Sequence, residues 1–196
     1  MDSAADKVKA EMVATSELMQ LSTESDIPET ASAIATAIYK VMSGGGKLLL
    51  AGNGGSAADA QHIAAEFVNY FSFPRKALPA IALTTDTSVL TSISNDTDFN
   101  LVFSRQIEAI GNKGDIVWLY TTSGTSKNIV QAAKTAKLCG LQVVCFTGAN
   151  GGSIGEFTDY LISVPSTSTP KIQEVHLTVG HAISGIVESM FFSPND

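Results

Sequence analysis

The chain contains little cysteine and little positive charge, and it has no long apolar run. Its two cysteines, Cys139 and Cys145, form no C-x-x-C motif, so we expect reduced thiols rather than a disulfide framework. Only 12 Lys and Arg residues oppose 19 Asp and Glu residues, and a net charge of −7 argues against a broad nucleic-acid surface. No run is long enough to span a bilayer, and the first residues lack the apolar core of a signal peptide. We therefore expect a cytoplasmic protein with a small-molecule ligand and neither a nucleic-acid nor a membrane partner.

The apolar residues that are present predict an α/β fold. Five continuous apolar runs, bounded by Gly, Pro and Asp, are typical of parallel strands buried on both faces. They lie at residues 47–51, 79–83, 116–120, 142–147 and 160–164. Helices are expected near residues 56–71, 87–93, 99–110, 126–138 and 171–192. The alternation predicts a doubly wound sandwich with a five-stranded parallel sheet, which binds ligands beyond the carboxyl ends of its strands.

Two more helices are expected before the first strand. Residues 2–23 carry a narrow apolar stripe, and residues 29–43 follow Asp26, a candidate N-cap, and Pro28, which suits a first helical turn. One face of a sheet does not need both helices, so their surplus apolar surface indicates a subunit interface. We therefore divide the chain into an amino-terminal helical oligomerisation segment, residues 1–43, and a main domain, residues 44–196.

A glycine-rich turn follows the first predicted strand. Gly52, Gly54 and Gly55 let the backbone turn sharply and approach a ligand closely, because they have no Cβ. Ser56 is expected to cap the next helix together with Asp59, three residues later. The N–H groups of the first helical turn would then form a site for an anion such as phosphate.

Two loops at other expected strand ends have a similar composition. Residues 121–126 and 147–153 are rich in hydroxyls and glycine, and the first of them opens a helix. Neither loop itself contains a lysine, so a phosphate monoester fits them better than a nucleoside triphosphate. Each loop alone is equally well explained as an ordinary turn, but two at equivalent positions favour phosphate binding.

The histidines differ in their expected roles. His62 lies four residues before Glu66, so the two share one face of the helix that follows the glycine turn. Such a pair is more often a surface or capping pair, but its nearness to the turn favours a site. In the last helix, His176 is expected to be a hydrogen-bonded residue of the core or its edge. His181 lies in an otherwise apolar segment and is the stronger candidate for a functional role.

Several segments resemble the phosphoheptose isomerases, a family of the sugar-isomerase (SIS) domain. They are GNGGSAADAQHIAAE, LPAIALTTDTSVLTSISND, VFSRQIEAIG, GDIVWLYTTSGTS and IQEVH followed by GH. The resemblance implies a flavodoxin-like SIS fold and an aldose–ketose isomerase that converts D-sedoheptulose 7-phosphate to D-glycero-D-manno-heptose 7-phosphate through an enediol. It also implies a role in heptose and lipopolysaccharide core biosynthesis, a homotetramer with sites at subunit interfaces, and one zinc per subunit.

The resemblance further implies which residues form the site. The zinc ligands would be His62, Glu66, Gln173 and His181. Glu66 and His181 would be catalytic, which agrees with the need of an enediol reaction for a base at carbon and an acid at oxygen. The substrate contacts would be Asn53, Gly54, Gly55, Ser56, Glu66, Asn95, Asp96, Thr121, Thr122, Ser123, Ser126 and Gln173.

One implied pair raises a geometric problem. Eight residues of continuous helix would separate Gln173 from His181 by about 12 Å, which is too far for both to reach one ion. Either Gln173 lies at or before the start of the helix, or one of the two comes from a neighbouring subunit.

The sequence also departs from the family at three positions. Tyr70 and Lys171 stand where members usually carry Arg, and Thr125 stands where they usually carry Asn. Losing a bidentate Arg can weaken phosphate binding. The candidates to replace it are Arg75, Lys76 and Arg105.

Other functions stay open from the sequence. A noncatalytic SIS-domain binder, resembling the replication-initiator-associating proteins, is the first alternative, although those relatives lack the carboxylate and the last histidine that are present here as Glu66 and His181. Gly52-x-Gly54-x-x-Ala57 also fits a dinucleotide-binding oxidoreductase, but the acidic ribose-binding residue expected about 20 residues later is missing. SIS-type regulators and amino-sugar isomerases are a further option.

Overall fold

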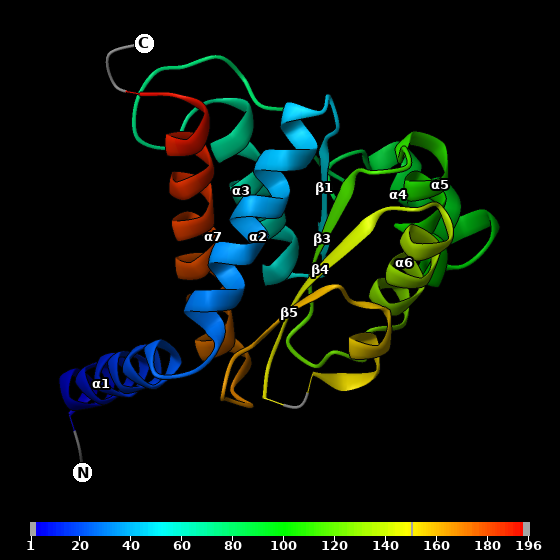
Figure 1. The fold of residues 1–196 in the computed structure, drawn as a ribbon. Coiled ribbons are helices and arrows are strands. Elements are labelled where there is room, and N and C mark those ends of the chain that lie inside the picture. Colours follow the sequence, from blue (N-terminus) through cyan, green and yellow to red (C-terminus); the bar gives the residue numbers. More distant parts are fainter. Residues whose placement is uncertain (1–2, 150, 194–196) are drawn as a thin grey trace.

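The fold is a parallel sheet with helices on both faces (Figure 1). The computed structural model describes residues 3–149 and 151–193. Five strands lie in the order β2-β1-β3-β4-β5, and all neighbours are parallel. Their bounds confirm each predicted strand: β1 Leu48–Gly52, β2 Ala80–Ala82, β3 Ile116–Tyr120, β4 Gln142–Thr147 and β5 Tyr160–Ser163. The expected doubly wound α/β class is therefore correct.

The helices also follow the expected pattern, with one interruption. The α-helices are α1 Ala4–Thr23, α2 Ile27–Ser43, α3 Gly55–Val68, α4 Thr87–Asp96, α5 Ser104–Ile110, α6 Lys127–Leu138 and α7 Thr169–Phe191. Two 3-10 turns are η1 Phe99–Leu101 and η2 Gly152–Phe157. The single helix expected at residues 99–110 is thus split into η1 and α5. Its first turn tightens because the Asp98 carboxylate accepts the N–H of Asn100.

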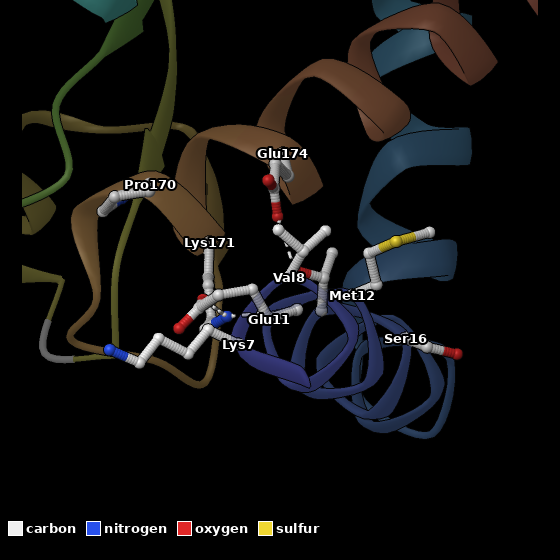
Figure 2. Close-up of a pocket in the computed structure, with 9 residues that line it drawn as sticks. Lys7, Val8, Glu11, Met12, Ser16, Pro170, Lys171 and Glu174 are labelled. Atoms are coloured by element: carbon white, nitrogen blue, oxygen red, sulfur yellow. Dashed lines mark hydrogen bonds and ion pairs between the residues drawn. The ribbon is translucent and has the colours of Figure 1, made fainter. Parts of the chain in front are cut away.

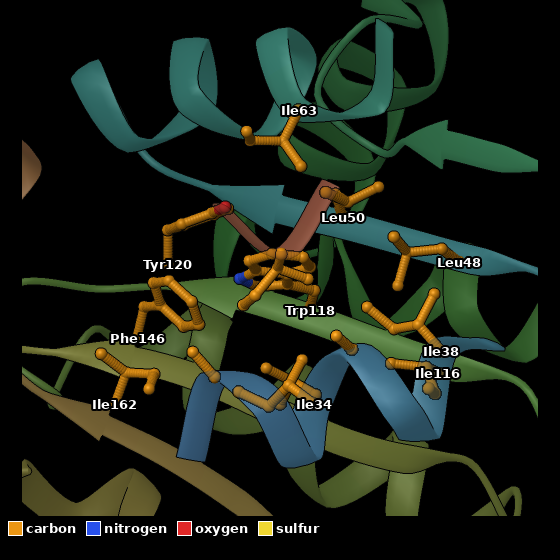
Figure 3. Packing of buried hydrophobic residues seen from close by; sticks show 14 of the residues in the cluster. Ile34, Ile38, Leu48, Leu50, Ile63, Ile116, Trp118, Tyr120, Phe146 and Ile162 are labelled. Carbon is orange, nitrogen blue, oxygen red and sulfur yellow. The ribbon is translucent and has the colours of Figure 1, made fainter. Parts of the chain in front are cut away.

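Two hydrophobic cores lie on opposite faces of the sheet. Alternate residues of each central strand point to opposite sides, as expected for strands buried on both faces. On the first face, Trp118, Tyr120 and Phe146 pack beneath α2, α3 and α7 (Figure 3). On the second face, Val117 and Leu119 pack with residues of α5 and α6. The sheet is therefore a rigid base from which loops and helices position the polar side chains.

The two amino-terminal helices behave differently from each other. α2 contributes buried residues to the first core and packs against α7. α1 instead projects from the body and leaves Val8, Met12 and Leu21 exposed (Figure 1). Its predicted use in a subunit interface, and the division at residues 43 and 44, stay predictions. Within the described ranges, no helix combines the length and apolar character that a membrane span needs.

Candidate active site

The glycine turn connects β1 to α3 through a backbone that few other residues adopt. Gly54 has a φ of +57° and occupies the N-cap position of α3. Ser56 was expected to be the cap, and this is wrong: it is buried inside the first helical turn, because the chain turns two residues earlier. A Cβ on Gly55 would lie 2.7 Å from Nε2 of Gln173, so a larger residue here would displace the amide of Gln173.

Gln173 contacts the glycine turn of its own chain. Its Nε2 lies 3.3 Å from Oγ of Ser56. Helix α7 begins at Thr169 and runs to Phe191, so Gln173 is in its second turn and not at or before its start. The first explanation for the distance between Gln173 and His181 is therefore wrong. A ligand contributed by a neighbouring subunit stays a prediction.

Three candidate ligands meet between α3 and α7. His62 Nε2 is 2.8 Å from His181 Nε2 and 3.3 Å from Glu66 Oε1. The donor atoms of the three residues all lie within 4.8 Å of one another. Two imidazole nitrogens and a carboxylate oxygen form a donor set that suits a divalent metal such as zinc. The structure thus brings together three of the four residues expected to bind metal.

Burial affects the titration of groups beside this triad. Partial burial lowers the pKa of His181, the charge on His62 lowers it further, and Glu66 opposes the shift. A lower pKa favours the neutral imidazole, which is the form that ligates a metal. One turn before His62, burial raises the pKa of Asp59 to about 6, although the charge on His62 opposes this shift.

His176 has the structural role that the sequence indicated. It is fully buried on α7, and its Nε2 lies 3.1 Å from the carbonyl oxygen of Thr147. Burial lowers the pKa of His176 to about 4, so the ring is neutral near pH 7. The prediction of a hydrogen-bonded core histidine is confirmed.

The hydroxyl-rich loops after β3 and β4 lie side by side. Together with the start of α7 they line a hollow of about 270 Å³, formed by Thr122, Ser123, Gly148, Ala149, Ser166, Thr167 and Thr169. Thr121 is buried and its Oγ1 lies 3.3 Å from Oγ of Ser126, so this hydrogen bond joins the two ends of the loop. Asn150, also part of the third predicted loop, lies outside the described residues.

The remaining expected substrate contacts occupy separate places. Asn53 exchanges two hydrogen bonds, of 2.9 and 2.8 Å, with the amide of Asn128, which ties the glycine turn to α6. Asn95 and Asp96 form the exposed end of α4, where Nδ2 of Asn95 donates to Asp96 over 2.7 Å. Within the described chain, no hydrogen bond or ion pair joins Asn95 or Asp96 to the triad.

The basic residues proposed to replace a missing Arg do not gather at the hollow. Arg75 is buried and pairs with Glu188, so it is unavailable to a phosphate. Arg105 pairs with Glu108 on the surface of α5. Lys171, at one of the positions that depart from the family, pairs with Glu11 of α1 over 2.6 Å (Figure 2).

Comparison with known proteins identifies the family. A model of the SIS domain matches residues 12–148. The phosphoheptose isomerase of Burkholderia pseudomallei (strain 1710b) is 55% identical over 163 residues, which cover 83% of each chain. The chain belongs to the phosphoheptose isomerases of the SIS domain family. It is therefore an isomerase, and a similar phosphoheptose isomerase from Synechocystis is 53% identical over 82% of this chain and 83% of that protein.

Solved structures of phosphoheptose isomerases agree in fold. The structure from Neisseria gonorrhoeae superposes with a TM-score of 0.90 at 37% identity and covers 95% of this chain and 100% of that one. The structure from Francisella tularensis gives 0.92 at 32% identity, over 96% and 100%. These relatives favour the isomerase over the noncatalytic binder and the oxidoreductase.

The sequence did not place three residues beside the triad, and for Arg75 it suggested only a phosphate contact. The ring of Phe71 lies 5.6 Å from the ring of His181, and Arg75 and Glu188 form a buried ion pair beside it. Arg75 and Glu188 lie on different elements, and no local motif links them. The only sequence signal was a glutamate inside an apolar helix, since a buried carboxylate requires a partner.

Proposed function

We propose that this phosphoheptose isomerase converts D-sedoheptulose 7-phosphate into D-glycero-D-manno-heptose 7-phosphate, a step toward the heptose of the lipopolysaccharide core. The observation that carries the proposal is the meeting of His62, Glu66 and His181 within 4.8 Å. Moving a proton between adjacent sugar carbons requires a base and an acid in one place, and the triad supplies both kinds of group. Relatives that bear the name phosphoheptose isomerase at 55% identity support a phosphorylated heptose as substrate.

Zinc fits the donor set of the triad. The two Nε2 atoms of His62 and His181 are 2.8 Å apart, so a shared proton or a shared cation is needed to satisfy both lone pairs. When bound, zinc would polarise the sugar carbonyl and stabilise negative charge on its oxygen. A fourth ligand from Gln173 would come from a neighbouring subunit, because in its own chain this residue contacts Ser56.

The chain's own residues would move the protons. Glu66 takes a proton from C1 of the ketose, the C1–H electron pair forms the C1–C2 double bond, and His181 gives a proton to the carbonyl oxygen at C2. From the resulting enediol, His181 takes the proton of the C1 hydroxyl and Glu66 returns its proton to C2. Both residues end the cycle in the protonation states in which they began it.

The phosphate would bind in the hollow that Thr122, Ser123 and Thr169 help to line. Twelve residues of α7 separate Thr169 from His181, a rise of about 18 Å. This distance exceeds the reach of a seven-carbon sugar phosphate. We therefore propose that the hollow of one subunit and the triad of another form each site, in a homotetramer.

Turnover with and without metal tests the activity. The purified protein, incubated with sedoheptulose 7-phosphate in D₂O, should yield an aldoheptose phosphate that carries deuterium at C2, because the proton that Glu66 holds exchanges with solvent before it is returned to C2. A chelator should abolish the product, and added zinc should restore it. If the zinc-loaded protein forms no aldoheptose phosphate, the proposed function is wrong.

Mixing inactive variants tests the shared site. Since Glu66 and His181 lie in the same chain's triad, Glu66→Gln and His181→Gln subunits should give no activity when dissociated and reassembled together. Glu66→Gln subunits reassembled with a variant of the phosphate hollow, Thr122→Ala combined with Ser123→Ala, should regain activity. The intact triad of the hollow variant then meets the intact hollow of the Glu66→Gln subunit in one site, while the reciprocal site has neither half intact. Recovery in the first mixture and none in the second would contradict the arrangement.

A further inference from the structure

The loop after α3 is tied to the carboxyl end of α7 by one buried carboxylate. Glu188 accepts the N–H groups of Phe71 and Ser72, each over 2.7 Å, and Nε of Arg75 over 3.0 Å. The side chains of Arg75 and Glu188 are only 3% and 1% exposed. Burial alone would raise the pKa of Glu188, but these three donors hold it below its usual value, so the group stays ionised. In Figure 1 this loop passes over the end of α7.

The guanidinium of Arg75 reaches in the other direction, to the last turn of α3. Its Nη2 donates to the carbonyl oxygen of Glu66 over 2.7 Å, and its Nη1 donates to those of Phe67 and Asn69 over 2.8 and 3.1 Å. Carbonyls at the end of a helix have no partners within the helix, and a cation there also favours the helix dipole. Arg75 therefore fixes the turn that carries Glu66.

The same loop places an aromatic ring against His181. The ring of Phe71 lies 5.6 Å from that of His181, and a Cβ on Gly185 would lie 3.1 Å from the Phe71 ring. On the other side, a Cβ on Gly180 would lie 2.9 Å from Cδ1 of Ile63, so α7 approaches α3 closely just before His181. His181 is thus held between a close helix contact and the loop.

We propose that Arg75 and Glu188 are positioning residues, which fix the carboxyl end of α3 to α7 and so hold Glu66 and His181 at the spacing that the metal requires. The inference rests on the proposed function of the triad. The pair itself touches neither the donor atoms nor the hollow, so its effect would pass through the backbone of Glu66 and the ring of Phe71. Groups that orient metal ligands typically change metal affinity by 10- to 100-fold when they are lost.

The chain contains a closely matched control in the turn before β3. Asp115 is 2% exposed and accepts two backbone N–H groups, those of Lys47 and Asn112, together with the ammonium of Lys47. Glu188 likewise accepts two backbone N–H groups and one cation. Replacing either carboxylate by its amide therefore removes the same kind of buried interaction, but only one of the two lies beside the triad.

The test compares Glu188→Gln with Asp115→Asn in the full chain. Zinc affinity is measured by competition with a chelating dye, and the Co²⁺-loaded proteins are compared by their absorption spectra, which report the ligand geometry. Both variants should melt at lower temperature. Only Glu188→Gln should weaken zinc binding, by about tenfold or more, and shift the cobalt bands.

The outcomes separate the two proposals. If the unaltered protein binds no zinc and has no isomerase activity, the proposed function fails. If the unaltered protein binds zinc and is active, but Glu188→Gln has the same zinc affinity and cobalt spectrum as Asp115→Asn, the positioning role is overturned. Phe71→Ala keeps the ion pair and alters a residue that is 37% exposed, so it should fold even if Glu188→Gln does not. It should weaken zinc binding to a smaller extent, and unchanged affinity would count against the proposal.

Discussion

Charged groups at the amino ends of the strands and those of the triad are arranged in opposite ways. Before β3 and β5, Asp115 and Asp159 each accept an N–H group of a neighbouring chain segment, from Lys47 over 2.9 Å and from Val143 over 2.7 Å. Each carboxylate also pairs with a lysine over 2.6 Å. These carboxylates are satisfied by the protein itself, and their effect is to fix the strands.

The triad instead gathers acceptors. Two imidazole nitrogens lie 2.8 Å apart beside the carboxylate of Glu66, and no Lys or Arg of the described residues pairs with that carboxylate. Grouped lone pairs without an internal cation are costly unless a proton or metal joins them. The carboxylates at the amino ends of the strands therefore stabilise the fold, whereas the triad is arranged to bind a ligand. Substitutions can perturb the two functions separately.

The largest effect should come from Glu66→Gln. Loss of the carbon base should lower kcat/KM by about 10³-fold or more, because general base catalysis contributes about 10²- to 10⁴-fold and the metal site also loses a carboxylate. The melting temperature of the metal-free protein should hardly change, since the side chain is partly exposed. Glu108→Gln, an exposed glutamate paired with Arg105, is the control and should retain full activity. Activity in Glu66→Gln above about a tenth of the original would contradict its role.

Asp115→Asn should show the reverse behaviour. Breaking a buried pair by removing one charge costs about 3 to 4 kcal/mol of the free energy of unfolding, measured by urea denaturation. The activity of the folded fraction should stay unchanged, because the residue lies at the amino end of the sheet. Asp159→Asn removes a more exposed pair and should cost less than about 1 kcal/mol. Equal losses in the two variants would show that burial does not decide the difference.

Much of the fold follows from local sequence. Continuous apolar runs identified all five strands, because a strand buried on both faces needs no polar alternation. The start of α3 was misplaced at Ser56, because a serine is a common cap while a positive φ at Gly54 depends on how the turn closes. Local rules therefore located the elements better than their ends.

Some features of the site follow from local sequence, and others depend on how distant segments pack. The pairing of His62 with Glu66 follows from helical spacing alone. The approach of His181, 119 residues later, follows only from the packing of α7 on α3. The ion pair of Arg75 with Glu188 joins residues 113 apart, and the sequence instead suggested a phosphate contact for Arg75. A charged residue does not specify its partner until the chain has folded.

On α7, His176 should affect stability and not ligand binding, and its effect should depend on pH. Its ordinary pKa of 6.5 falls to about 4 in the folded protein, so below pH 6.5 the unfolded chain binds a proton that the folded chain does not. Its contribution is therefore fully present above pH 6.5 and is lost as the pH falls toward 4. Between pH 7 and pH 5 this should lower the free energy of unfolding by about 2 kcal/mol. Urea denaturation with chelator present should show a smaller loss in His176→Gln, and identical losses would contradict this account.

The smallest effect concerns the hollow at the carboxyl ends of the strands. Ser123→Ala removes one hydroxyl from its lining and should raise KM for the sugar phosphate about tenfold with little change in kcat, since a hydrogen bond to a charged group is worth about 1.5 kcal/mol or more. Ser153→Ala is the control, because Ser153 lines a different hollow with Lys127 and Lys134. A raised KM in the control alone would place the phosphate beside those lysines. In that case the carboxyl ends of the strands would bind phosphate through lysines and not through loop hydroxyls. They would still differ from the amino ends, where the lysines pair with Asp115 and Asp159 of the protein itself.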